Sequence, residues 1–508
     1  MAEPAKQLQL IDNEDTQKKL KSKIFETHTE ELVIGLCGPI GTDINFVSKR
    51  LEQILSDTFD YKCVFIKLSD LIVTHGKVDT NSNYNGFDRY NKLINAGNDL
   101  RDKYDSSVLA ELAINEITVR RELNKKDDKY KTERICYIID SIKNKEELDI
   151  FRLIYRDIFY FIGVYSPVDL RVKSLKDKGM KEEDIYKLFD RDSGEEYAHG
   201  QMVGDTFVKA DFFLRIEDNS SSHIDIKLQR FLNLLFEHEI VTPTTDETAM
   251  YLASSAAGNS ACLSRQVGAC ITDSEGEVLS IGWNDVPKVN GGVYQTDLKN
   301  PTFDKRCMNR GNGICFNDKE KNEITNLLVE DIISKGLISD LKKSELTSVI
   351  KKSRIKELIE FSRAVHAEML AIISGSQKSG SKMIGGKLYC TTYPCHNCAR
   401  HIIAAGIKEV YYIEPYRKSL AVKLHDDAIT ENEANEHLVR ILMYDGISPR
   451  RYLDFFKMAE SKRKLNGMKI SNSPKKVIPK NTISLQAIPY LEKEVTKDLA
   501  NKNLISLE

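Results

Sequence analysis

The sequence lacks the features that mark membrane, secreted or strongly nucleic-acid-binding proteins. It has no apolar run of about 18 residues, so it is not expected to cross a membrane. Lys and Arg total 74 and Asp and Glu total 76, and a formal net charge of −2 disfavours bulk electrostatic binding of nucleic acid. Its first residues are polar and give no secretory signal, so a cytoplasmic protein is expected. The ten cysteines are scattered except for Cys395 and Cys398, which favours reduced thiols and metal ligation over disulfides.

What the chain does contain indicates a folded protein of several domains. It has 508 residues, of which 41% are hydrophobic, and at this length about two to four domains are expected. In the first half, apolar runs alternate with stretches of helical spacing, which predicts an α/β unit with a mainly parallel sheet. We divide the chain into a polar tail (1–30), a first unit (31–241), a second unit (242–456) with an insertion (287–362), and a basic tail (457–508). Residues 457–480 of that tail are expected to be extended and partly flexible.

The sharpest motif is His366-Ala367-Glu368, followed further along by Pro394-Cys395-His396-Asn397-Cys398. The H-x-E…P-C-x-x-C pattern is typical of zinc deaminases. One imidazole and two thiolates leave the fourth tetrahedral position of a zinc ion open for water, which is the arrangement of a catalytic site. Glu368 is close enough in sequence to reach that water without being a ligand, and we expect it to transfer protons. The alternative is a structural zinc knuckle at Cys395 and Cys398, with His396 or His401 nearby and with His366 and Glu368 as surface residues.

Further segments resemble the deoxycytidylate deaminase family. They are Ser264-Arg265-Gln266-Val267-Gly268-Ala269, Gly282-Trp283-Asn284, Val365 to Ile372, Leu388 to Ala399 and Ala404 to Val410. The resemblance implies a five-stranded mixed sheet flanked by helices, a zinc cofactor and a deoxycytidine nucleotide substrate, dCMP or dCTP, that is deaminated to the deoxyuridine nucleotide.

The resemblance also implies the residues that bind the substrate. Asn284 is expected to contact the deoxyribose, and Arg265 and Thr392 are further substrate-binding candidates. Asn284 can instead be an ordinary turn residue, and Arg265 a solvated charge on a loop.

A strand, a Gly-rich turn and a helical pattern open the first unit, which is the context of a phosphate-binding loop. The turn, Gly38-Pro39-Ile40-Gly41-Thr42-Asp43, has Thr42 at the position of the usual Lys and Asp43 at the position of the hydroxyl. Backbone amides can still hold a phosphate there, but the charge that grips the β- and γ-phosphates is missing. The alternative is an ordinary turn between strand and helix.

Two other features extend this nucleotide-binding hypothesis. Asp140 ends an apolar strand as a Walker-B acid does, and the region from Arg171 to Phe212 resembles the lid and last strand of deoxynucleoside monophosphate kinases. The resemblance predicts a parallel-sheet, P-loop kinase-like first unit. Because the Lys is absent, we expect a regulatory nucleotide sensor rather than a phosphotransferase.

A degenerate kinase-like unit ahead of a deoxycytidylate deaminase resembles the bacterial antiphage deoxycytidine nucleotide deaminases. This resemblance implies that the protein depletes deoxycytidine nucleotides during phage infection. It also implies that the enzyme is held inactive beforehand, in some family members by a small RNA, and that the protein is a homo-oligomer. A housekeeping dCMP deaminase, a nucleic-acid-editing deaminase that uses the basic tail, and a catalytically dead sensor remain as alternatives.

Cys307 and Cys315 lie in the insertion, and some deoxycytidylate deaminases have a second, structural zinc there. No His lies between these two cysteines, so the other ligands have to come from elsewhere. Buried reduced thiols are the alternative.

Overall fold

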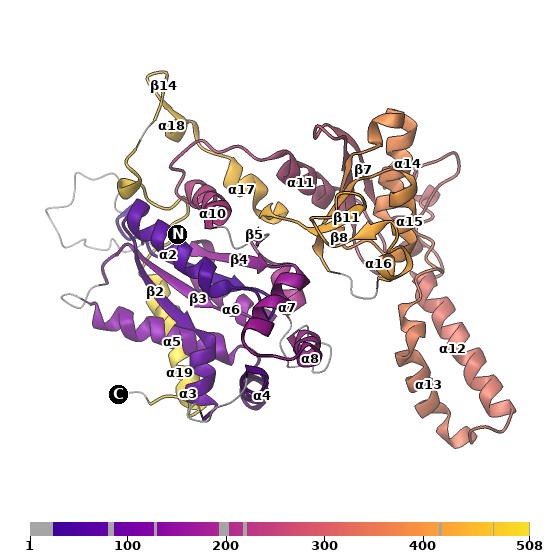
Figure 1. Cartoon of the computed structure of the whole chain (residues 1–508), viewed down its shortest axis with the longest axis horizontal. Helices are drawn as coiled ribbons and strands as arrows, with labels where there is room; N and C mark the ends of the chain where they lie inside the picture. Colours follow the sequence, from indigo (N-terminus) through magenta and orange to yellow (C-terminus); the bar gives the residue numbers. More distant parts are fainter. Residues whose placement is uncertain are drawn as a thin grey trace, which may run out of the picture.

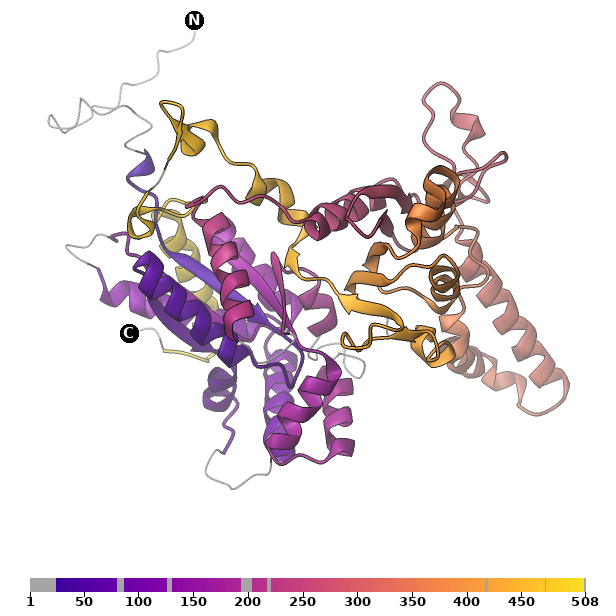
Figure 2. The ribbon, with the colours of Figure 1, turned by 45° about the horizontal axis from the view of Figure 1, so that its top comes forward.

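The computed structural model describes residues 24–79, 86–125, 130–192, 203–216, 221–415, 419–470 and 472–506 (Figure 1). Residues 1–23 of the expected polar tail lie outside the described residues. Two α/β units stand beside each other, and a helical pair projects from the second (Figures 1 and 2). Within the described ranges, no helix combines the length and the apolar character needed to cross a bilayer.

The first unit has a six-stranded sheet in the order β12-β5-β4-β1-β3-β2. Five of these strands are parallel, as expected, and the sixth, β12, comes from near the end of the second unit and runs antiparallel to β5. The strands are β1 (Leu32–Cys37), β2 (Lys62–Lys67), β3 (Ile135–Asp140), β4 (Phe159–Tyr165), β5 (Phe212–Arg215) and β12 (Gly446–Ile447).

Alternating side chains of these strands supply two hydrophobic layers, because successive residues of a strand point to opposite faces. Ile34 and Leu36 pack with α2 and α10 on one face, while Val33 and Cys37 pack with α3, α5 and α6 on the other. The helices of this unit are α2 (Ile44–Phe59), α3 (Leu68–His75), α4 (Gly86–Lys103), α5 (Val108–Leu123), α6 (Lys145–Tyr155), α7 (Val168–Asp177), α8 (Glu182–Asp192), α9 (Val203–Phe207) and α10 (Ser221–Leu235).

The second unit has a mixed sheet in the order β10-β11-β9-β8-β6-β7. The expected five strands are present, and the two-residue strand β10 adds a sixth at the edge. The strands are β6 (Gly268–Thr272), β7 (Val278–Trp283), β8 (Lys387–Thr392), β9 (Glu409–Glu414), β10 (Ile429–Thr430) and β11 (Val439–Met443). The helices are α11 (Thr245–Ala257), α14 (Ala367–Ser379), α15 (His396–Ala404) and α16 (Ala421–Leu424). The predicted α/β class is therefore confirmed.

The insertion folds outward from the second unit. Its two longest helices, α12 (Phe316–Ser334) and α13 (Lys343–Lys352), contact each other and project from the unit as a hairpin (Figure 1). The start of α12 and the segment after α13 lie at its base, where they reach the cavity described below.

The last part of the predicted basic tail (457–508) is an ordered helix. Helix α19 (Ala487–Asn501) lies against α5 of the first unit, with Ile488 and Leu499 buried (Figure 1). Arg121 of α5 forms a 2.9 Å ion pair with the buried Glu492. The basic composition of the segment concealed an amphipathic helix whose apolar face meets a partner far away in the sequence. Between α19 and β12 lie α17 (Tyr452–Phe456), α18 (Glu460–Arg463), β13 (Lys464–Leu465) and β14 (Met468–Lys469).

Candidate active site

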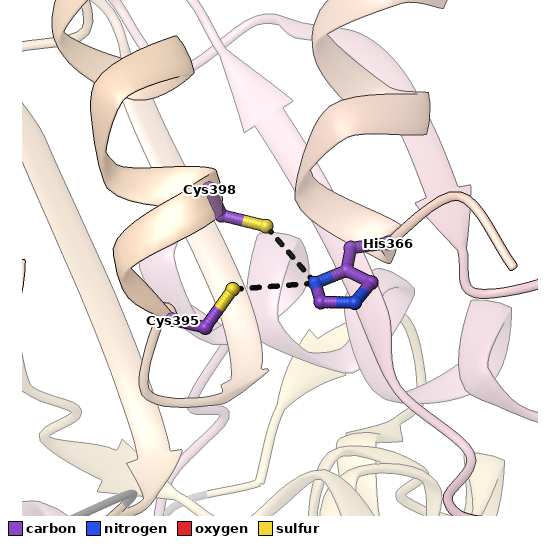
Figure 3. Close-up of side chains that lie close together, drawn as sticks. All are labelled: His366, Cys395 and Cys398. Carbon is purple, nitrogen blue, oxygen red and sulfur yellow. Dashed lines mark hydrogen bonds between the residues drawn. The ribbon is translucent and has the colours of Figure 1, made fainter. Parts of the chain in front are cut away.

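Two helix N-termini of the second unit bring the motif residues together. His366 is the N-cap residue of α14, and Cys395 is the N-cap residue of α15, with Cys398 one turn inside that helix. His366 Nδ1 lies 3.3 Å from the Sγ atom of each cysteine (Figure 3). Helix N-termini favour negative charge, so this position suits thiolates.

The two cysteines differ in their electrostatic environment. The hydrogen bond with Cys398 lowers the pKa of Cys395. Burial raises this pKa, but the hydrogen bond and the charge of His366 outweigh burial, and the result is a pKa of about 4. The same hydrogen bond with Cys395, together with burial, raises the pKa of Cys398. Burial disfavours the charged His366 ring, but the bond to Cys395 and the charge of Glu368 outweigh it and raise its pKa to about 9. The lowered pKa favours the thiolate form of Cys395, which is the form that binds a metal ion.

The side chains present fit a zinc ion. The ligand atoms of His366, Cys395 and Cys398 all lie within 4.8 Å of one another, and within the described residues they are the one such group of three or more His, Cys, Asp or Glu. A nitrogen and two sulfurs are the donor set of a catalytic zinc with an open fourth position. His401 bonds Asn397 O at 2.7 Å and His396 lies 3.7 Å from Glu360, so neither completes a four-ligand knuckle.

Glu368 lies in the first turn of α14, two residues from the ligand His366, and is 4% exposed. Burial raises its pKa above the ordinary value, while the charge of His366 acts in the opposite direction. A carboxyl group whose proton affinity is raised in this way suits a group that has to accept a proton and release it again.

A cavity of about 540 Å³ opens beside these residues. That volume falls within the range of about 300–1,000 Å³ seen for small-molecule sites. Six of the predicted site residues line it together: Asn284, Arg265, Thr392, His366, Glu368 and Cys395. The structure therefore brings two of the three predicted metal ligands, Glu368 and the three substrate-binding candidates to one cavity.

Asn284 follows β7 and is 7% exposed. Its Oδ1 accepts a 2.7 Å hydrogen bond from the backbone N–H of Val267, and its Nδ2 donates at 2.8 Å to the carbonyl of Arg265. The amide thus fixes the loop before β6 at the wall of the cavity, which is more than an ordinary turn residue does.

Arg265 and Thr392 meet at one carboxylate. Glu414, the last residue of β9, accepts a 2.9 Å hydrogen bond from Arg265 Nη1 and a 3.3 Å hydrogen bond from Thr392 Oγ1. The Arg265 side chain is 52% exposed, so this ion pair is weak and open to exchange with another anion.

Comparisons with known proteins match the second unit. The family model described as "Cytidine and deoxycytidylate deaminase zinc-binding region" matches residues 243–414. Deoxycytidylate deaminase of Enterobacteria phage T4 is 30% identical over 172 residues, which are 34% of this chain and 79% of the phage protein. The chain belongs to the deoxycytidylate deaminase family. ComE operon protein 2 of Bacillus subtilis (strain 168) is 50% identical over 56 residues, 11% of this chain, and the match spans only 29% of that protein.

A solved structure, dCMP deaminase of cyanophage S-TIM5 in complex with dCMP and dUMP, is 20% identical with a TM-score of 0.24, covering 40% of this chain and 99% of that one. Because the family match is a zinc-binding region and the deaminase unit has a group that could hold a metal ion, the prediction of a zinc cofactor is confirmed. The match begins at residue 243 and does not test the first unit.

The insertion of the second unit does not place Cys307 and Cys315 in a ligand group. Cys307 Sγ is 3.9 Å from Arg363 Nη1 and Cys315 Sγ is 3.5 Å from Ser264 Oγ. Within the described residues, neither cysteine joins a cluster of three or more His, Cys, Asp or Glu side chains.

The Gly-rich turn of the first unit is held by interactions within the protein. Gly41 has φ +89°, and Arg171 Nε donates a 2.8 Å hydrogen bond to the carbonyl of Ile40. Asp43 caps α2 by accepting from the backbone N–H of Phe46, which explains an acid at the hydroxyl position. Thr42 Oγ1 is buried without a hydrogen-bond partner in the described part of the chain.

A carboxylate occupies the amide side of this turn. Asp192 lies at the end of α8 and is 2% exposed. Its carboxylate accepts a 2.7 Å hydrogen bond from the Ile40 N–H and forms a 2.6 Å ion pair with Lys143. A Cβ atom at Gly38 would lie 2.6 Å from the carbonyl oxygen of Val164. Asp140 accepts a hydrogen bond from the hydroxyl group of Ser141. A carboxylate of the protein itself thus occupies the Ile40 amide of this turn.

Several residues of the deaminase cavity carried no signal in the sequence. Lys321 and Lys356 come from the insertion, and Gly204 and Asp205 come from α9 of the first unit. Single charged or small residues in irregular segments are not distinctive, and only the folded chain shows that these four share a cavity with the zinc ligands.

Proposed function

We propose that this protein hydrolyses the exocyclic amino group of deoxycytidine nucleotides, converting dCMP, dCTP or both, with water, to the deoxyuridine nucleotide and ammonia. The observation that carries the proposal is the group of His366, Cys395 and Cys398 beside the buried Glu368, at a cavity of about 540 Å³. Membership of the deoxycytidylate deaminase family supports the same substrate class.

The proposed roles follow from position. A zinc ion held by His366, Cys395 and Cys398 would act as a Lewis acid and make water nucleophilic near neutral pH. The Glu368 carboxylate takes the proton of the attacking water and passes it to the ring nitrogen N3. It then takes the proton of the hydroxyl group newly added at C4 and passes it to the departing amino group, which leaves as ammonia while the C4 carbonyl forms. The buried position of Glu368 keeps bulk water from competing for that proton.

Three residues are proposed to bind the rest of the nucleotide. Asn284 holds the sugar at the wall of the cavity and leaves little room for a 2′-hydroxyl group. Thr392, on β8, belongs to the same cavity lining, and Arg265 breaks its ion pair with Glu414 to bind the phosphate. Their convergence on one cavity supports these assignments.

The test is to incubate the pure, zinc-loaded protein with dCMP, dCTP, CMP and single-stranded DNA and to follow uracil products. Conversion of dCMP or dCTP with CMP and DNA unchanged is the expected result. Conversion of DNA alone would favour the editing alternative, and no product from any of the four would contradict the proposal.

The nucleic-acid-editing alternative has less support. It relies on the basic segment 457–480, yet Lys462 and Lys480 are ion-paired with Glu237 of the first unit, and Lys480 also bonds the carbonyl of Lys457. These contacts engage part of the charge that a nucleic acid would need.

We propose further that the first unit is a nucleotide-responsive control element of an antiphage deaminase, in a homo-oligomer. The P-loop-like turn without its Lys and the sharing of strand β12 between the units support control in place of phosphotransfer. The role is tested by plating phage on cells that express the protein or its Glu368→Ala variant. We expect fewer plaques with the protein than with the variant, and equal numbers of plaques would favour a housekeeping enzyme. Co-purified RNA would identify an inhibitory transcript.

A further inference from the structure

The wall of the deaminase cavity is built from both units. The metal ligands, Glu368 and Asn284 come from the second unit, whereas Gly204 and Asp205 belong to α9, which lies between α8 and β5 in the first unit. A unit that the family match does not reach therefore supplies part of the surface that surrounds the proposed substrate. The inference below rests on the proposed function.

Helix α9 is firmly anchored on one side. Val203, Thr206 and Phe207 are buried. The Phe207 ring packs on Phe213 of β5 with centroids 5.4 Å apart, and it closes over Gly163 of β4. The wall is thus attached to the central strands of the first sheet and has a defined position.

The other side of α9 is open. Asp205 is exposed, and a Cβ atom built on Gly204 would meet no heavy atom within 4 Å. Gly204 does not have positive φ, so the backbone does not require glycine there. A larger side chain at 204 can be accommodated by the fold and would extend into the free space of the cavity.

The charges along this cavity do not favour a highly charged ligand. The lining holds three cations, Arg265, Lys321 and Lys356, against the carboxylates Asp318, Glu357, Glu368 and Glu414. Lys321 is paired with Asp318 at 3.1 Å, and an Arg265 that turns from Glu414 to a first phosphate leaves the Glu414 carboxylate without that partner. Asp205 adds a further negative charge to the same lining. Each additional phosphate of a ligand would be repelled by this carboxylate, and few cations of the lining remain to offset that repulsion.

We propose that α9 is the specificity wall of the deaminase: Gly204 leaves room for the nucleotide, and Asp205 disfavours the triphosphate relative to the monophosphate. The first unit thereby takes part in substrate selection directly, and a displacement of α9 changes the cavity itself.

The steric part is tested in the full-length, zinc-loaded protein with Gly204→Ala, Gly204→Leu and Gly204→Trp. We expect kcat/KM for dCMP to fall with side-chain volume, by about tenfold or more for Trp, as substrate positioning is lost. Zinc content and Tm should remain those of the unmodified protein. Leu123→Trp, which adds bulk at a residue of α5 that is 79% exposed and remote from the cavity lining, is the matched control.

The electrostatic part is tested with Asp205→Asn, which keeps size and removes charge. The ratio of kcat/KM for dCTP to that for dCMP should rise by about two- to tenfold at low salt, and less at high salt. Asp177→Asn, an exposed acid of α7 outside the cavity lining, should leave the ratio unchanged.

The outcomes separate the two proposals. A wild-type protein that deaminates no deoxycytidine nucleotide contradicts the proposed function, whatever the variants do. An active wild-type protein whose Gly204→Trp variant keeps full kcat/KM, or whose Asp205→Asn variant keeps the wild-type ratio, overturns the inference. If Gly204→Trp loses zinc or stability, the Gly204→Ala and Asp205→Asn variants decide it.

Discussion

Asp192 and Ile40 are 152 positions apart in the chain, yet a carboxylate oxygen of Asp192 accepts a 2.7 Å hydrogen bond from the Ile40 backbone N–H. Lys143 approaches the other oxygen at 2.6 Å. The protein thus fills the anion side of its P-loop-like turn with its own side chain, and a phosphate would have to displace Asp192 to bind there.

The first prediction concerns this turn. The full-length protein should not phosphorylate dCMP with ATP, because the turn has no Lys to stabilise the transferred phosphoryl group. Gly41→Asp should alter control of the deaminase in cells while zinc content stays the same, since a Cβ at 41 would lie 2.9 Å from Arg171 Cβ and φ is +89°. Clear ATP-dependent production of dCDP would show the assignment to be wrong.

The second prediction separates the proton carrier from the ligands. Glu368→Ala should retain zinc but lose nearly all uracil formation, whereas His366→Ala should lose metal and activity together. Elemental analysis and product formation are measured on the same preparations. Substantial turnover by the Glu368→Ala protein would remove Glu368 from its proposed role.

The third prediction is a pH dependence in metal-free protein. The pKa of Cys395 is lowered to about 4, so the reactive thiolate persists as pH falls and is lost only as pH passes below that value. Alkylation by iodoacetamide should therefore modify Cys395 at a nearly constant rate from about pH 8 to about pH 5 and slow below about pH 4, with Cys398 far less reactive because its pKa is raised. Mass spectrometry identifies the site, and added zinc should protect it. A rate that rises steeply around about pH 8–9, as it does for an ordinary thiol, would contradict the assignment.

The fourth prediction concerns the sugar. Asn284→Ala should lower kcat/KM for the deoxynucleotide by about 10–100-fold, the scale of one or two hydrogen bonds, because it also releases the loop at Arg265 and Val267. The unmodified protein should prefer dCMP to CMP. Equal rates on the two would show that Asn284 does not select against a 2′-hydroxyl.

The fifth prediction concerns the C-terminal helix. Glu492→Ala should lower the free energy of unfolding of the first unit by about 3–5 kcal/mol, because it leaves the buried Arg121 with one carboxylate partner fewer. Chemical denaturation provides the measurement. Lys497→Ala, which removes an exposed ion pair on the same helix, is the control and should leave the transition unchanged. Coincident curves for the two variants would mean that α19 does not stabilise the first unit.

The motif residues of the deaminase unit were predictable because their spacing carries chemistry. His366, Glu368, Cys395 and Cys398 are placed by two helix N-termini, and that local geometry follows from the sequence pattern itself. Apolar runs likewise indicated the longer strands of the two sheets, whereas the two-residue strands β10 and β12 carry no such run.

The sequence by itself therefore predicted the α/β class, the family and the three residues that the fold gathers into a group able to hold a metal ion. The tertiary structure alone decided that β12 joins the first sheet, that α19 docks on α5, that Asp192 closes the turn at Ile40, and that Gly204 and Asp205 face the deaminase cavity. Each of these contacts joins segments that are far apart in the chain or lie in different units. Such contacts depend on how whole layers pack, and a short stretch of residues records its own periodicity but not the surface that will cover it.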